Sequence, residues 1–69
     1  MYRYLVVIEK AENNFSAYVP DLPGCIATGD TLETTEKNIH QAIKLHIKGM
    51  KEDNLPIPAA NTIAEFVAI

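Results

Sequence analysis

Acidic side chains are the first candidates for chemistry in this sequence, because metal-dependent hydrolysis needs carboxylates that converge on the metal ions. Asp21, Asp30 and Glu33 lie in segments whose residue types favour turns and a helix start. A carboxylate in such a segment usually caps backbone N–H groups. Glu9 lies at the far end of an apolar run. We therefore expect no catalytic or metal-binding residue among these four.

Two histidines and one cysteine are the other reactive side chains. His40 and His46 are six residues apart, which misses the four-residue step that puts two metal ligands on one helix face. His46 falls within an apolar stripe, so we expect a hydrogen-bonded core or interface histidine. Cys25 has no basic residue close in sequence, which indicates a buried thiol rather than a reactive thiolate. The sequence therefore predicts no metal, no cofactor and no covalent catalysis.

The composition predicts a single small cytoplasmic domain. The chain has 69 residues and a formal charge of −3, from nine acidic and six basic residues. Nucleic-acid binders usually carry a basic excess or stripe, whereas mild acidity suits a basic protein partner. A single cysteine indicates a reducing compartment. The apolar residues 5–8 are too few for a signal peptide or a membrane span.

Residue patterns predict four strands and one helix. Runs of β-branched, aromatic and apolar residues, bounded by turn residues, indicate the strands. The helix begins at Asp30 or Thr31 and continues to about residue 53, with apolar residues at three- and four-residue steps. Asn54 can adopt the left-handed conformation that ends a helix. The predicted strands cover residues 2–9, 15–19, 25–28 and 63–69.

These elements predict an α+β fold of order β-β-β-α-β in one domain. The first three strands form an antiparallel meander, because the connections between them are short. A right-handed crossover through the helix would place the fourth strand beside the first and parallel to it, giving the order 3-2-1-4. One helix covers only one face of this sheet. We therefore expect a homo-oligomer, a dimer or larger, that covers the other apolar face.

A sharp corner lies between the second and third predicted strands. Pro20 cannot donate to a sheet, so the strand before it ends there. In the segment Leu22-Pro23-Gly24-Cys25, proline and glycine occupy the two central positions of a type II turn. Asp21 can accept a hydrogen bond from a nearby backbone N–H and stiffen the bend. The corner is either a purely structural turn or a rigid loop that presents Asp21 and Leu22 to a partner.

Four segments of the chain resemble the HicB antitoxin family of prokaryotic HicAB toxin–antitoxin modules. They occur in the family's order and at its spacing, and together they span nearly the whole chain. The segments are Tyr4-Leu5-Val6-Val7-Ile8, Pro20-Asp21-Leu22-Pro23-Gly24-Cys25, Gly29-Asp30-Thr31-Leu32-Glu33 and Glu52-Asp53-Asn54-Leu55-Pro56-Ile57-Pro58. The resemblance implies a partial ribonuclease H-like domain, which agrees with the strand order predicted from the residues.

The resemblance also implies a function. HicB proteins bind the small basic toxin HicA, a messenger-RNA ribonuclease, and block its active site. Many family members add a C-terminal DNA-binding domain. Residues 1–69 end with the last predicted strand, so we expect a single HicB-like domain without that addition and without direct DNA binding. Ribonuclease H-like nucleases carry a carboxylate near the middle of the first strand, where this chain has Val6 and Val7, and we expect no enzyme activity.

Two functions remain open at this point. The first is an antitoxin that neutralises a HicA-like ribonuclease by covering it. The second is a stand-alone regulatory or small-molecule-binding domain of the same fold without a toxin partner. For the first, loop geometry rather than the family resemblance singles out Asp21, Leu22 and Asp30 as partner-binding residues. A carboxylate on a stiff corner could pair with toxin lysines or arginines.

Overall fold

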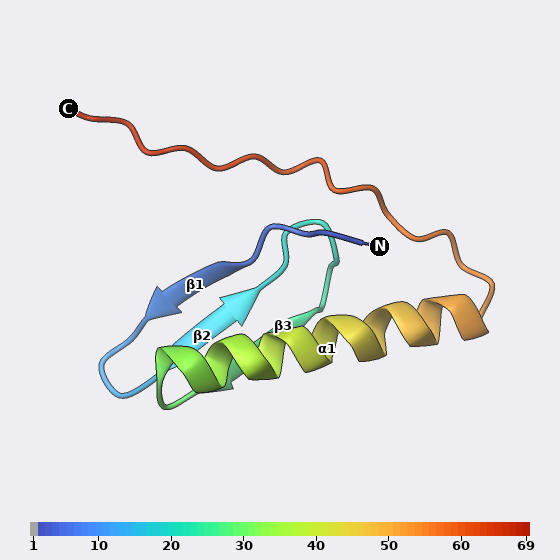
Figure 1. The fold of residues 1–69 in the computed structure, drawn as a ribbon, viewed down its shortest axis with the longest axis horizontal. Helices are drawn as coiled ribbons and strands as arrows, with labels where there is room; N and C mark the ends of the chain where they lie inside the picture. The colour runs from blue at the N-terminus through green and yellow to red at the C-terminus, as the bar shows by residue number, and fades with distance from the viewer. Residues whose placement is uncertain (1) are drawn as a thin grey trace.

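The computed structural model describes residues 2–69 and shows three strands and one helix (Figure 1). Strands β1, β2 and β3 form one antiparallel sheet in the order β1-β2-β3. The helix α1 packs on one face of this sheet. The elements are β1 (Val7–Lys10), β2 (Phe15–Tyr18), β3 (Ile26–Gly29) and α1 (Leu32–Glu52). The predicted α+β class and the antiparallel meander are therefore confirmed.

The sheet register separates two faces. Ile8, Ala17 and Ala27 stand opposite one another across the three strands and pack in or against the buried core. Because side chains alternate along a strand, the neighbouring residues point away from α1. Two rows lie on this far face: the apolar row of Val7, Tyr18 and Ile26, and the polar row of Glu9, Ser16 and Thr28.

Both ends of α1 are capped by the residues around them. Thr31 is the N-cap, and its hydroxyl accepts a hydrogen bond of 3.1 Å from the Thr34 N–H. The helix therefore begins after Thr31, and Asp30 lies outside it. At the other end, Asn54 adopts φ 57°, and the Leu55 N–H donates to the Met50 carbonyl oxygen at 2.8 Å. This is a Schellman ending, and the predicted left-handed cap at Asn54 is confirmed.

The connection from β3 to α1 fixes where the helix lies. Only Asp30 and Thr31 separate the two elements, so α1 folds back directly along β3. A Cβ placed on Gly29 would lie 2.6 Å from the Thr35 Oγ1 and 2.8 Å from the Thr35 nitrogen. Thr35 is itself fully buried and donates its hydroxyl to the Thr31 carbonyl oxygen. The helix therefore packs on β3 and β2 and leaves β1 uncovered.

The corner between β2 and β3 completes the core. Gly24 has φ +83°, and the Cys25 N–H donates to the Leu22 carbonyl oxygen at 3.0 Å, as the predicted type II turn requires. The corner folds inward, so that Leu22 has no exposed surface. The buried cluster consists of Ala17, Val19, Leu22, Cys25 and Ile39.

The predicted fourth strand is not found in the single chain. Residues 56–69 are extended but form no ladder with β1 (Figure 1), so the order 3-2-1-4 is not formed. Strand-like composition predicts an extended backbone, yet pairing also requires a neighbouring edge within reach. The first strand is also shorter than predicted. Its pairing begins at Val7, because Tyr18 is the last residue of β2 and the chain turns at Pro20.

We predict that Gly29→Ala destabilises the domain, by about 1–3 kcal/mol, as expected for overpacking against an immobile backbone. Gly49→Ala is the matched control, since a Cβ at this helical glycine meets nothing within 4 Å. It should stabilise the domain by about 0.5–1 kcal/mol, because alanine loses less backbone entropy than glycine. Urea unfolding followed by circular dichroism measures both changes. Equal effects of the two substitutions would contradict this account of the β3–α1 contact.

Candidate functional site

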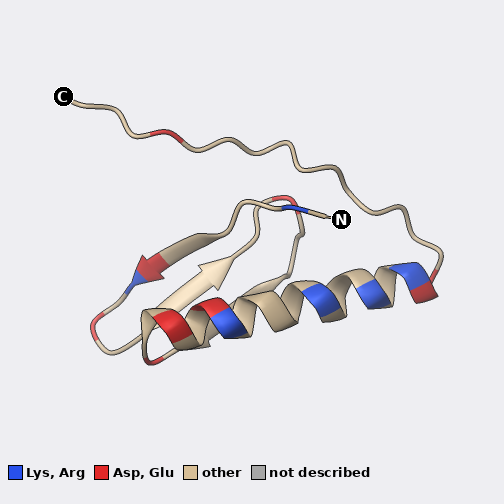
Figure 2. Ribbon diagram, viewed as in Figure 1, with Lys and Arg blue, Asp and Glu red and all other residues tan. Residues whose placement is uncertain are grey.

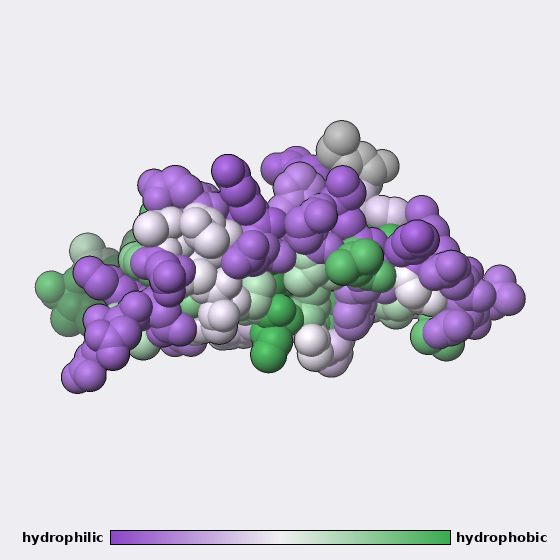
Figure 3. Space-filling view, turned by 90° about the horizontal axis from the view of Figure 1, so that it is seen from below, coloured by the Kyte–Doolittle hydropathy of each residue, from purple (hydrophilic) through white to green (hydrophobic). Residues whose placement is uncertain are grey.

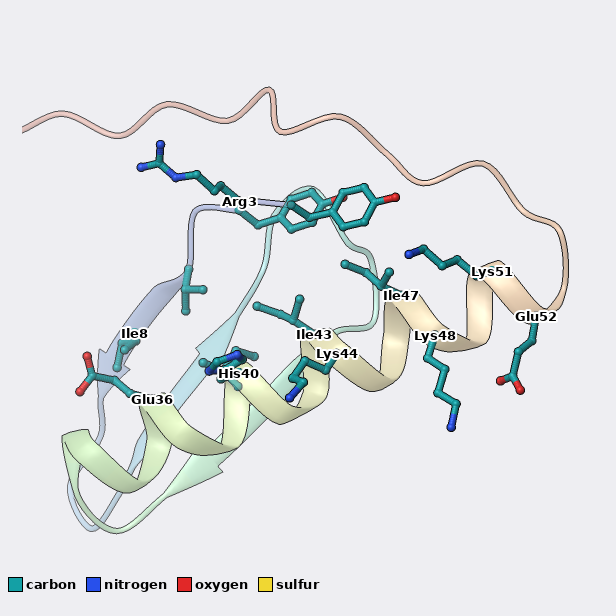
Figure 4. A pocket seen from close by; sticks show the side chains of 14 residues that line it. Arg3, Ile8, Glu36, His40, Ile43, Lys44, Ile47, Lys48, Lys51 and Glu52 are labelled. Carbon is teal, nitrogen blue, oxygen red and sulfur yellow. The ribbon is translucent and has the colours of Figure 1, made fainter.

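A groove lies between the N-terminal residues and α1 (Figure 4). It exists because α1 covers β2 and β3 but not β1. Its volume is about 930 Å³. The strand side contributes Tyr2, Tyr4, Val6 and Ile8, which share one face, and Arg3. The helix side contributes Ile39, Ile43, Ile47 and six polar or charged side chains.

The rim of the groove is predominantly basic. The lining includes four basic residues, Arg3, Lys44, Lys48 and Lys51, and two acidic residues, Glu36 and Glu52. Figure 2 shows that basic residues dominate the second half of α1, although the chain as a whole is acidic. The Lys51 Nζ lies 5.2 Å from the centroid of the Tyr2 ring, within the range of a cation–π contact. The groove therefore suits an occupant that is apolar and carries negative charge.

Asp21 binds the C-terminal segment of the chain. Its Oδ2 accepts hydrogen bonds from the Asn61 N–H at 3.2 Å and the Thr62 N–H at 3.1 Å. Its Oδ1 accepts from the Thr62 hydroxyl at 2.9 Å. The expectation that Asp21 stiffens its own bend is thus corrected, because its recorded donors are forty residues away in the sequence. The local turn pattern around Asp21 gave no signal of this long-range role.

Tyr4 provides the second attachment of the same segment. Its hydroxyl donates to the Pro58 carbonyl oxygen at 2.6 Å. Burial, followed by the nearby Tyr2 and Asp21, raises the pKa of the Tyr4 hydroxyl, which keeps it in the donating form. Residues 58–62 are therefore held beside the N-terminal end of the first strand. The residues after Thr62 extend beyond both attachments (Figure 1).

The structure separates the three predicted partner-binding residues. Asp30 is exposed just before α1, and Asp21 is half-buried at the corner. They lie beyond opposite ends of β3, so they do not form one cluster. The Leu22 side chain is 0% exposed and belongs to the core. The expectation that Leu22 is presented on the surface is therefore wrong. The corner turns this apolar side chain inward, where it packs in the core instead of contacting solvent.

The histidines and the cysteine lie apart from one another in residues 2–69. No group of three or more His, Cys, Asp or Glu side chains in this range could hold a metal ion. Cys25 is buried as predicted, and burial raises the pKa of its thiol. His40 is exposed at the groove, and His46 is half-buried in the helix. No helix in the described range has the length and apolar character of a membrane span.

The most exposed apolar side chains of the described residues lie at three separate places. Ile26 on the far face of the sheet is 69% exposed, and Leu45 on α1 is 68% exposed. The third place is the C-terminal segment, in which Phe66 and Ile69 are fully exposed. Seen from below Figure 1, the surface is mostly hydrophilic, with separate hydrophobic patches and a further group at its left edge (Figure 3). The far face is only partly apolar, because its second row is polar.

The fold and the groove together define a small α+β domain with an open, largely apolar surface hollow. The family model of the HicB-like antitoxin of bacterial toxin–antitoxin systems matches residues 4–69. The chain therefore belongs to this HicB-like antitoxin family. The resemblance found in the four sequence segments is thereby confirmed.

Individual relatives agree with this assignment. A UPF0150 protein of Synechocystis is 34% identical over all of this chain and 89% of its own length. An uncharacterized protein of Haemophilus phage HP1 is 41% identical over 93% of this chain, which spans only 48% of the phage protein. A chain in the solved HicA3 and HicB3 toxin–antitoxin complex superposes with a TM-score of 0.73 and 30% identity. That match covers 87% of this chain and 70% of the other.

We predict that Asp21→Ala releases residues 61 and 62 from the corner. Hydrogen exchange at the Asn61 and Thr62 amides should accelerate by about tenfold, because three hydrogen bonds to one carboxylate are lost. Asp30→Ala is the control, since it removes a carboxylate beyond the other end of β3. Unchanged exchange in Asp21→Ala would show that these contacts do not hold the segment in solution.

We also predict that Cys25 resists alkylation in the folded protein. Iodoacetamide should react roughly a hundredfold more slowly than in urea, because only opened molecules expose the thiol. Burial raises the pKa of Cys25, so the folded thiol stays protonated where the unfolded thiol ionises. Raising the pH from 7 to 9 should therefore accelerate the folded protein by the larger factor, because its thiol stays far from full ionisation while the unfolded thiol approaches it. Mass spectrometry of the alkylated product measures both rates, and similar rates in the two states would contradict the burial.

Proposed function

We propose that this protein is an antitoxin that neutralises a small HicA-type messenger-RNA ribonuclease by covering its active site. The observation that carries the proposal is the likeness, over 87% of the chain, to a chain of the HicA3 and HicB3 complex. Membership of the HicB-like antitoxin family supports it. The reaction chemistry would belong to the toxin, and this chain would contribute a binding surface as a non-catalytic cytoplasmic partner.

The acidic surface outside the groove suits a basic toxin. The formal charge is −3, and the exposed side chains of Asp30 and Glu33 lie together at the start of α1. Asp21 uses three acceptor positions for residues 61 and 62, and an ionised carboxylate offers about four. We propose that Asp30, and Asp21 through its remaining position, pair with lysines or arginines of the toxin. The basic rim of the groove would repel the same toxin.

One observation favours a second candidate function. The groove is about 930 Å³ and largely apolar at its base, within the size range of small-molecule sites. A stand-alone regulatory domain could bind a small apolar acid there without any toxin. Thermal-shift measurements with a panel of such acids would identify this function, and a toxin-dependent phenotype would argue against it.

We predict that the purified chain co-elutes with the basic protein encoded by a neighbouring reading frame and suppresses its ribonuclease activity. Asp30→Lys should weaken the complex by about tenfold, because an attractive charge pair becomes repulsive. Glu12→Lys is the matched control, since it makes the same charge change in the exposed β1–β2 turn. Isothermal titration calorimetry at two salt concentrations measures both variants.

The outcomes separate two levels of the proposal. Failure of the wild-type chain to bind or inhibit such a toxin would overturn the antitoxin function. Normal binding with equal, small effects of the Asp30 and Glu12 substitutions would leave that function standing and remove Asp30 from the interface.

A further inference from the structure

The C-terminal segment of residues 63–69 contains four of the ten exposed large hydrophobic side chains of the described residues. Its bulky side chains are almost completely exposed, although residues 58–62 directly before it are held by Tyr4 and Asp21. The segment is rich in residues that favour strands, and Glu65 is its one charged side chain. The bulky side chains are Ile63, Phe66, Val67 and Ile69.

The groove lies beside an unpaired edge of the sheet. β1 pairs with β2 along one edge, and its other edge has no strand beside it in the described chain. Unpaired edges of this kind readily accept another strand. The helix side of the groove extends from Glu36 to Glu52, which spans about 24 Å at 1.5 Å per residue. Residues 63–69 span about 20–23 Å when extended, so the segment and the groove match in length.

The charge and the apolar character of residues 63–69 also complement those of the groove. Arg3, Lys44 and Lys48 lie at the groove, and Glu65 is the charged residue of the segment. Ile43 and Ile47 project from α1 toward the N-terminal residues (Figure 4), where they can contact β-branched and aromatic side chains. A basic toxin would meet like charge at this rim, so the groove suits the segment better than it suits the toxin.

We propose that residues 63–69 of one copy occupy the β1–α1 groove of a second copy, and that the exchange is reciprocal. Within one chain, the segment passes the N-terminal strand without forming a ladder, and a second hollow lies between Arg3–Leu5 and Ala60 and Thr62. In the exchanged dimer the segment supplies the fourth strand beside β1 from the partner copy. Reciprocal exchange satisfies the self-complementarity of a two-fold dimer.

The area is sufficient for a stable dimer. Burying Phe66 alone removes about 150–250 Å² from water, and three more bulky side chains accompany it on each segment. Two exchanged segments and two grooves therefore exceed the total of roughly 1,200 Å² at which specific interfaces begin. This inference does not rest on toxin binding, because it concerns only copies of this chain.

The first experiment locates the dimer contact by full-chain variants that leave the core intact. Sedimentation equilibrium should give the wild type twice the 7.6 kDa mass of one chain. Phe66→Asp should give the mass of one chain. Leu45→Asp on the outer helix surface and Ile26→Asp on the far sheet face are controls that should remain dimeric. A monomeric wild type, or a dimer broken by either control and not by Phe66→Asp, overturns the proposal.

The second experiment separates exchange from folding of the segment onto its own chain. One variant carries Glu65→Lys, and the other carries Lys44→Glu and Lys48→Glu. Each alone should dimerise at least tenfold more weakly than the wild type, because segment and groove then have like charge. Mixing them should restore a heterodimer, since each segment then meets an oppositely charged groove. No gain of dimer on mixing would overturn the exchange, whatever the outcome of the toxin measurements.

Discussion

The close approach of Gly29 to Thr35 determines the shape of this domain. A two-residue connection joins β3 to α1, and Gly29 has no Cβ that would keep the backbone of β3 away from that of α1. The helix must therefore lie against β3 and β2. A 21-residue helix placed over that side of the sheet leaves β1 uncovered. The groove, its basic rim and the unpaired edge of β1 all follow from this placement.

Local features of the fold could be predicted from the sequence because neighbouring residues determine them. Pro23 and Gly24 allow one turn type, and Asn54 is among the few residues that tolerate a left-handed helix ending. The three- and four-residue steps predicted for the helix agree with the buried positions Thr35, Ile39 and Ile47. The choice between Asp30 and Thr31 as N-cap could not be made, because both side chains can accept the same kind of hydrogen bond.

Features that depend on distant parts of the chain could not be predicted. Asp21 looks like an ordinary turn residue, and its bonds to residues 61 and 62 require knowledge of the path of the whole chain. Leu22 next to it looks exposed in a loop, yet the corner places it at the centre of the core. The prediction of a fourth strand at residues 63–69 was wrong for the same reason. Composition specifies that residues 63–69 are extended, while their partner is specified by the geometry of β1.

The two prolines after the helix have a thermodynamic consequence. Pro56 and Pro58 restrict the backbone of the residues before them to extended conformations, and the Schellman ending at Asn54 fixes the direction in which the chain leaves α1. The chain after Pro58 therefore follows a backbone with restricted conformations rather than a flexible hinge. Residues 55–58 have therefore lost conformational entropy before any partner binds, which lowers the entropic cost of ordering this part of the chain on a receiving surface.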